Sequence, residues 1–132
     1  MKLTYILYTN AFSCLCFGSL FSLWPQKSAT FLSPETPAHT LVLTFTGIAL
    51  LLNGIHLMAT AMQKTPSRLV VRYFAVGDLA WVIATAIIIY LDQWITSAEG
   101  LIASLLVAAA VGVLGSSQWV LSYRHTDPVS DV

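Results

Sequence analysis

Hydrophobic residues dominate the chain in four long runs, separated by short segments that hold most of the prolines and charges. The runs cover residues 3–24, 39–62, 69–91 and 98–121. Each is long enough for the roughly 20 residues that an α-helix needs to cross the hydrocarbon core of a membrane. Because a helix satisfies its own backbone hydrogen bonds, the pattern predicts helices. We therefore predict an all-α, polytopic membrane protein, with a single four-helix transmembrane domain over residues 1–132.

Residues between the runs predict where helices begin. Thr36-Pro37 and Thr65-Pro66 each offer an N-cap threonine before a proline at the first helical position. Thr96-Ser97-Ala98-Glu99 has the form of a capping box. For the longest connection, residues 25–38, we expect a plain connector, with a short interfacial turn around residues 28–32 as the alternative.

Composition supports a membrane protein and narrows its partners. The chain is 57% hydrophobic and 9% charged, whereas soluble domains have about 25% charged residues. With a net charge of zero, nothing suggests a nucleic-acid partner, and the expected environment is the lipid bilayer. The first run starts with a single lysine and lacks a clear cleavage site, so we expect it to be retained as a span rather than removed as a signal peptide.

Basic residues predict the orientation of the spans. In a chain with four spans, the N-terminus, the second connection and the C-terminus share one side of the membrane. That side holds five of the six basic residues, and Lys27 lies on the other. Because lysine and arginine are enriched on the cytoplasmic side, we predict that both termini are cytoplasmic, in the inner membrane. The five residues are Lys2, Lys64, Arg68, Arg72 and Arg124.

Small residues recur at every fourth position along the fourth run. They are Gly100, Ser104, Ala108, Gly112 and Ser116. Such a ridge allows another helix to approach closely. The approaching helix belongs either to the same chain or to a second copy, so a homodimer or another membrane protein remains an alternative partner.

Polar residues inside the runs predict a buried cluster. Asn53 and His56 share one face of the second helix, and Asp78 and Trp81 share a face of the third. Asn53 and Asp78 each lie nine residues from the inner end of their runs, a depth of about 14 Å. Asn10 enters from the same side. We therefore predict a candidate intramembrane polar cluster of Asp78, His56, Asn53, Asn10 and Trp81.

Two interpretations of Asp78 follow from its depth. A charged aspartate at the centre of a bilayer costs about 3 kcal/mol on insertion scales, so it requires a partner. Asp78 either accepts hydrogen bonds from Asn53 or from the Trp81 indole and fixes two helices together, or it exchanges a proton with His56.

Enzymatic and cofactor chemistry find little support in the sequence. The chain contains no HExxH, GxSxG or phosphate-binding glycine motif. His56 is the single interior histidine, which argues against haem held by two histidines. Cys14 and Cys16 diverge on one helix, so a disulfide between them is not expected. We predict no catalytic residues, no metal ligands and no cofactor, and we expect the protein not to be an enzyme.

The segment Gly77-Asp78-Leu79-Ala80-Trp81 carries a resemblance. With this segment and its four-run plan, the whole chain resembles small bacterial four-helix inner-membrane proteins that have a Gly-Asp/Asn-x-x-Trp motif in the third helix. That resemblance implies the fold and no particular activity. The plan is also similar to that of small multidrug resistance transporters, which carry their essential glutamate in the first helix. Here the first helix has Asn10 and no acid, which argues against drug–proton antiport.

These observations lead to two functional hypotheses. The first is a non-enzymatic integral membrane binding or accessory protein that docks a lipid, an apolar ligand or a partner helix. The alternative is a small proton-coupled transporter in which Asp78 titrates and His56 relays the proton.

Overall fold

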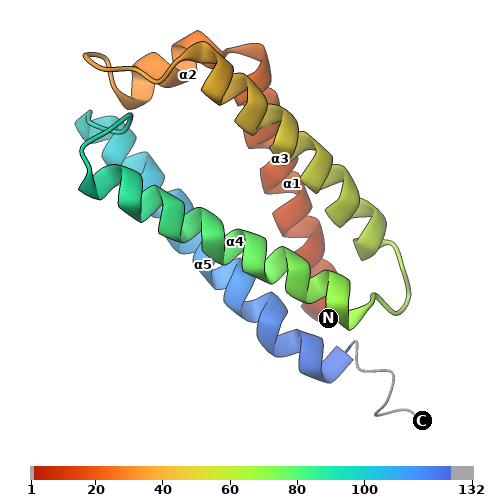
Figure 1. The fold of residues 1–132 in the computed structure, drawn as a ribbon. Coiled ribbons are helices and arrows are strands. Elements are labelled where there is room, and N and C mark those ends of the chain that lie inside the picture. The colour runs from red at the N-terminus through yellow and green to blue at the C-terminus, as the bar shows by residue number, and fades with distance from the viewer. Residues whose placement is uncertain (1, 126–132) are drawn as a thin grey trace.

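The computed structural model of the protein describes the backbone of residues 2–125 and the side chains of residues 3–122. This part of the chain is entirely helical (Figure 1). The helices are α1 (Lys2–Leu23), α2 (Pro25–Leu32), α3 (Thr40–Ala61), α4 (Arg68–Tyr90) and α5 (Ala98–His125). All except α2 are long and apolar enough to cross a membrane. The predicted fold class, an all-α bundle with four transmembrane helices, is confirmed, and the side on which the termini lie stays a prediction.

The predicted helix starts are partly wrong. The N-cap of α3 is His39, whose Nδ1 accepts a hydrogen bond from the Leu41 backbone N–H at 3.1 Å. The N-cap of α4 is Ser67. Thr36 and Thr65 therefore cap neither helix, because the proline after each still lies in the non-helical segment that precedes the helix.

Two further differences concern the connections. Residues 25–38 are not a plain connector, since Pro25 starts the short helix α2 at a position where the missing N–H of proline is no loss. At the start of α5, the Ser97 hydroxyl accepts a hydrogen bond from the Gly100 N–H at 2.8 Å. Ser97 is therefore the residue that caps α5, where the capping-box pattern pointed to Thr96.

The four long helices form two antiparallel pairs. The most extensive contacts join α1 to α3 and α4 to α5, with a smaller contact between α1 and α5. Among the described helices, α3 and α4 have no comparable contact. Figure 1 shows the pairs close together where α1 begins and α5 ends, and further apart towards α2. We call these the terminal end and the α2 end of the bundle.

Glycines bring α1 and α3 into direct backbone contact. A Cβ atom added to Gly18 would lie 2.8 Å from the Gly47 carbonyl oxygen, and a Cβ added to Gly47 would lie 2.8 Å from the Gly18 carbonyl oxygen. The same Gly47 Cβ would also overlap the Ser22 hydroxyl. This close approach is the kind that small residues permit between membrane helices.

The small-residue ridge of α5 does not form one such contact. Gly100 packs against the backbone of Leu32, Ser104 lines a cavity and Ala108 is buried. A Cβ on Gly112 would meet only Val82, at 3.7 Å, and Ser116 is exposed. Successive residues of the ridge therefore face different neighbours: first α2, then the cavity, then α4.

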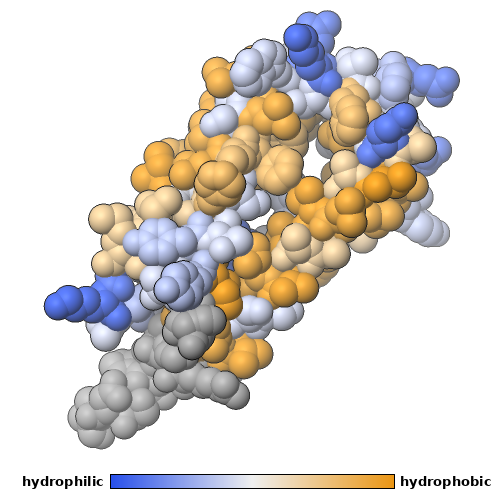
Figure 2. All heavy atoms as spheres, turned by 180° about the vertical axis from the view of Figure 1, so that it is seen from behind, coloured by the Kyte–Doolittle hydropathy of each residue, from blue (hydrophilic) through white to orange (hydrophobic). Residues whose placement is uncertain are grey.

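Apolar packing concentrates at the terminal end. Leu7, Leu57 and Val71 are fully buried there, and Phe74 is nearly so. Most other large hydrophobic residues are exposed, as expected of helices that face lipid. Figure 2 shows hydrophobic residues along the middle of the molecule and hydrophilic ones towards its two ends.

The contact between Gly18 and Gly47 yields a stability prediction. We expect Gly47→Ala to lower the free energy of unfolding by about 1–3 kcal/mol, because the added methyl group meets backbone that is unable to move aside. The matched control is Gly77→Ala in α4, where an added Cβ meets nothing within 4 Å. Unfolding in mixed micelles titrated with sodium dodecyl sulfate measures both. Equal stability of the two variants would contradict the close approach of α1 and α3.

Candidate functional site

Three buried side chains from three helices meet around one carboxylate oxygen. Asp78 Oδ2 accepts a hydrogen bond from Asn10 Nδ2 at 2.8 Å and another from Gln118 Nε2 at 2.6 Å. Asn10 Nδ2 also lies 3.1 Å from Gln118 Oε1. The exposed fractions are 2% for Asn10, 6% for Asp78 and 0% for Gln118. We call these three residues the carboxylate cluster.

The backbone of α5 explains how Gln118 reaches Asp78. A Cβ on Gly115 would lie 2.9 Å from the Asp78 Cβ, so the absence of a side chain lets α5 approach α4 at this point. Gln118 follows three residues later, on the same face of α5. This position places the side-chain amide of Gln118 against the carboxylate of Asp78.

A thiol extends the cluster towards α3. Cys14 Sγ lies 3.8 Å from Asn10 Oδ1, and Asn53 Nδ2 donates to Cys14 Sγ at 3.5 Å. Sulfur is a weak donor and a weak acceptor, so these contacts are weaker than those to the carboxylate. Asn53 therefore connects to the cluster through Cys14 and does not bond to Asp78 itself.

The structure brings together some of the predicted cluster residues and separates others. Asn10 and Asp78 are in direct contact, whereas Asn53 reaches them only through Cys14. Trp81 is half-buried in the wall of the adjoining cavities, but its indole does not donate to Asp78 in the described structure.

His56 lies outside the cluster, which corrects the prediction that it meets Asp78. Its side chain is exposed, and its ring stands edge-on to Phe74 with the centroids 4.9 Å apart. The buried face of α3 at this level belongs to Leu57 and Thr60, so the rotation of the helix leaves His56 at its side.

Gln118 is the residue that the sequence reasoning missed. It lies seven residues before the end of α5, and Asn10 lies eight residues after the start of α1. Since both ends are at the terminal end of the bundle, the two amides have similar depth. The predicted fourth run ends at residue 121, which places Gln118 only three residues from its inner end, so the depth argument does not pair it with Asp78. The greater depth of Gln118 comes from the continuation of α5 to His125.

Arg72 has other partners than Asp78. Its Nε donates to the Ser122 hydroxyl at 3.1 Å, and its guanidinium lies 5.0 Å from the centroid of the Trp119 ring. Both contacts tie α4 to α5 near the terminal end. The described residues place no cationic side chain in contact with Asp78.

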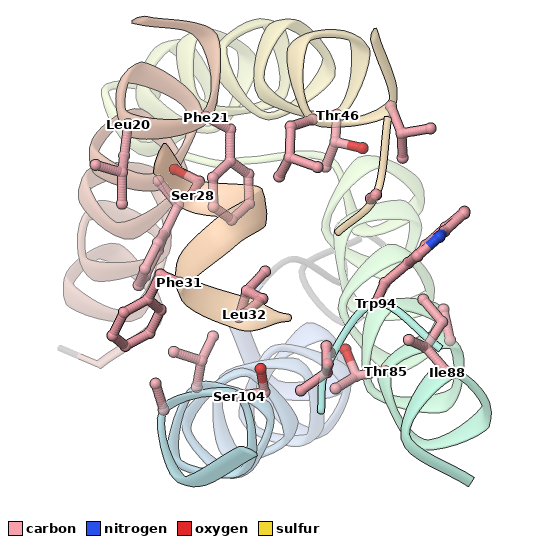
Figure 3. Close-up of a pocket in the computed structure, with 18 of the residues that line it drawn as sticks. Leu20, Phe21, Ser28, Phe31, Leu32, Thr46, Thr85, Ile88, Trp94 and Ser104 are labelled. Atoms are coloured by element: carbon pink, nitrogen blue, oxygen red, sulfur yellow. The ribbon is translucent and has the colours of Figure 1, made fainter. Parts of the chain in front are cut away.

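Two adjoining cavities lie between the helix pairs. The wide cavity has a volume of about 880 Å³ and the narrow cavity about 480 Å³. Figure 3 shows Phe21 of α1 and Leu32 of α2 pointing into the wide cavity, with Thr46, Thr85 and Ser104 on its walls. Six aromatic residues also line it: Phe17, Phe21, Trp24, Phe31, Trp81 and Trp94.

The narrow cavity leads from the wide one to the carboxylate cluster. The two share the side chains of Phe17, Thr46, Trp81 and Val107. Asn10, Cys14, Asn53 and Asp78 line the narrow cavity. The carboxylate cluster is thus the polar floor of a largely apolar space.

Hydrogen bonds at the end of α2 close the opposite end of the wide cavity. The Leu32 carbonyl accepts from the backbone N–H groups of Thr96 and Ser97, at 2.9 and 3.1 Å. The Ser97 hydroxyl donates to the Phe31 carbonyl at 2.7 Å, and the Ser33 and Thr96 hydroxyls are 2.6 Å apart. We call this set of contacts the α2 clasp. It joins the segment between the first pair of helices to the segment that leads into α5.

The geometry of the cluster predicts a selective loss of stability. We expect Gln118→Ala to lower the free energy of unfolding by about 1–3 kcal/mol, because a buried carboxylate loses one of its two donors. Ser116→Ala, an exposed change on the same helix, is the matched control and should stay within about 0.5 kcal/mol of the parent protein. If the two variants unfold alike in the detergent titration, Gln118 does not bond to Asp78.

Among the side chains of residues 3–122, no three of His, Cys, Asp or Glu lie close enough together to hold a metal ion. Comparisons of the chain with protein-family models, curated proteins and solved structures find no match. The carboxylate cluster and the adjoining cavities are therefore the features of the molecule that bear on its function.

Proposed function

We propose that this protein is a non-enzymatic integral membrane binding protein that holds an apolar ligand in the wide cavity between its helix pairs. The observation that carries the proposal is the cavity itself. Its volume of about 880 Å³ falls within the range of roughly 300–1,000 Å³ typical of ligand sites. Its lining of aromatic and aliphatic side chains, with few polar groups, suits a lipid-like molecule.

The cavity is better explained as a site than as a packing defect. Protein interiors are close-packed, and voids larger than a water molecule are few. Here the helix pairs are joined at both ends of the cavities, by the carboxylate cluster on one side and by the α2 clasp on the other. These two connections hold the space between the pairs open.

The ligand has a direct route from the bilayer. Because α3 and α4 lack extensive contact, the space between the pairs opens on the side of the bundle. Figure 2 shows an opening through the molecule between two apolar walls. An apolar molecule in the lipid could enter there without crossing water.

The alternative, a proton-coupled transporter using Asp78, receives support from one observation, the position of Asp78 on the wall of the narrow cavity. Against it, the proposed relay His56 is exposed and packs on Phe74. Without a relay beside Asp78 among the described residues, binding is the better-supported function.

Blocking the cavity tests the proposal. We expect Ser104→Phe to weaken ligand binding, because Ser104 faces the wide cavity and the added ring would take up part of the space that the ligand needs. Ile102→Phe is the matched control, since Ile102 is 60% exposed on the same helix and does not line the cavity.

The measurement is quenching of Trp81 fluorescence in lipid nanodiscs by dodecanol brominated along its chain. Trp24, Trp94 and Trp119 are replaced by phenylalanine in all samples, so that Trp81 alone reports. We expect saturable quenching that half-saturates at a higher concentration in Ser104→Phe and is unchanged in Ile102→Phe. Quenching that rises linearly with the alcohol and is equal in both variants would show contact from bulk lipid and contradict the proposal.

A further inference from the structure

Asp78 has one carboxylate oxygen engaged and one available. Both hydrogen bonds, from Asn10 and from Gln118, go to Oδ2. Oδ1 accepts no hydrogen bond from the described residues. It nevertheless differs from the fully buried polar atoms that lack a partner, because part of its surface is exposed. Since Asp78 is 6% exposed and lines the narrow cavity, Oδ1 is accessible from that cavity.

No cationic side chain among residues 3–122 pairs with the charge of Asp78. Asn10 and Gln118 are neutral amides, and Arg72 is directed to Ser122 and Trp119. Buried charges in proteins are usually paired, and inside a membrane an unpaired one is especially unfavourable. A cationic hydrogen-bond donor at Oδ1 would complete the site, and charge-assisted hydrogen bonds are the strongest kind.

We propose that the ligand is a long-chain primary amine, with its ammonium group on Asp78 Oδ1 and its chain passing Trp81 into the wide cavity. This inference rests on the proposed function, because it assigns the head group of the ligand held there. The shared wall of Phe17, Thr46, Trp81 and Val107 provides the passage from the polar floor to the apolar space.

The reverse orientation would place an anionic head group on Lys27, which also lines the wide cavity. Lys27 is exposed, so water already solvates its charge. Asp78 is buried, and its charge gains more from a partner. The amine orientation is therefore the favoured one.

The test compares brominated twelve-carbon probes with four head groups: primary ammonium, hydroxyl, trimethylammonium and carboxylate. Trp81 quenching in nanodiscs is measured in the unchanged cluster and in Asp78→Asn. We expect the primary amine to half-saturate at a concentration at least about tenfold below that of the alcohol. The trimethylammonium probe has the charge but no N–H donor, so it should bind less tightly than the primary amine.

Asp78→Asn should remove the preference for the amine while the alcohol binds as before, which also shows that the variant is folded. An amine that binds no better than the alcohol, a preference that survives Asp78→Asn, or a trimethylammonium probe that equals the amine would each overturn the inference. So would tight binding of the carboxylate that Lys27→Gln abolishes. The head-group comparison in the parent protein decides the matter even if Asp78→Asn does not fold. Failure of the alcohol itself to bind saturably would instead contradict the proposed function.

Discussion

The hydrogen bonds that Asp78 Oδ2 accepts from Asn10 and Gln118 are the interaction on which the arrangement of this bundle depends. A carboxylate within a membrane is stable only where donors reach it, and here the donors come from α1 and α5. Because α1 belongs to one helix pair and α4 and α5 to the other, the same bonds join the pairs. The requirement to satisfy one charge therefore acts together with the apolar packing at the terminal end to fix how the two hairpins meet.

The α2 clasp performs the corresponding task at the other end of the bundle. It combines backbone hydrogen bonds from the N–H groups of Thr96 and Ser97 to the Leu32 carbonyl with hydroxyl contacts of Ser97 and of Ser33. The loop that reaches it includes Asp92 and Trp94 in the left-handed region, with φ of 57° and 62°, which is unfavourable for residues other than glycine. Between clasp and cluster the pairs remain apart, and this separation creates the cavity on which the proposed binding function rests.

Much of the fold could be predicted from the sequence, and the site only in part. Length and hydropathy locate four spans, since the bilayer fixes how long an apolar helix must be. Depth along the spans correctly relates Asn10 to Asp78. Helix rotation is not predictable in the same way, because nearly every position of a span is apolar and lipid is as apolar as the core. For that reason His56 was placed in the cluster, and the close contact of Gly18 with Gly47 was not anticipated.

The most direct test of the central claim is a double-mutant cycle between Asn10 and Asp78. The free energy of unfolding is measured for the parent protein, Asn10→Ala, Asp78→Ala and the double variant, all in the same bicelles. A bond between the two helix pairs predicts a coupling energy of about 0.5–2 kcal/mol, the range of interhelical hydrogen bonds in membranes. Additive effects of the two substitutions, within about 0.3 kcal/mol, would contradict the claim that this hydrogen bond joins the helix pairs.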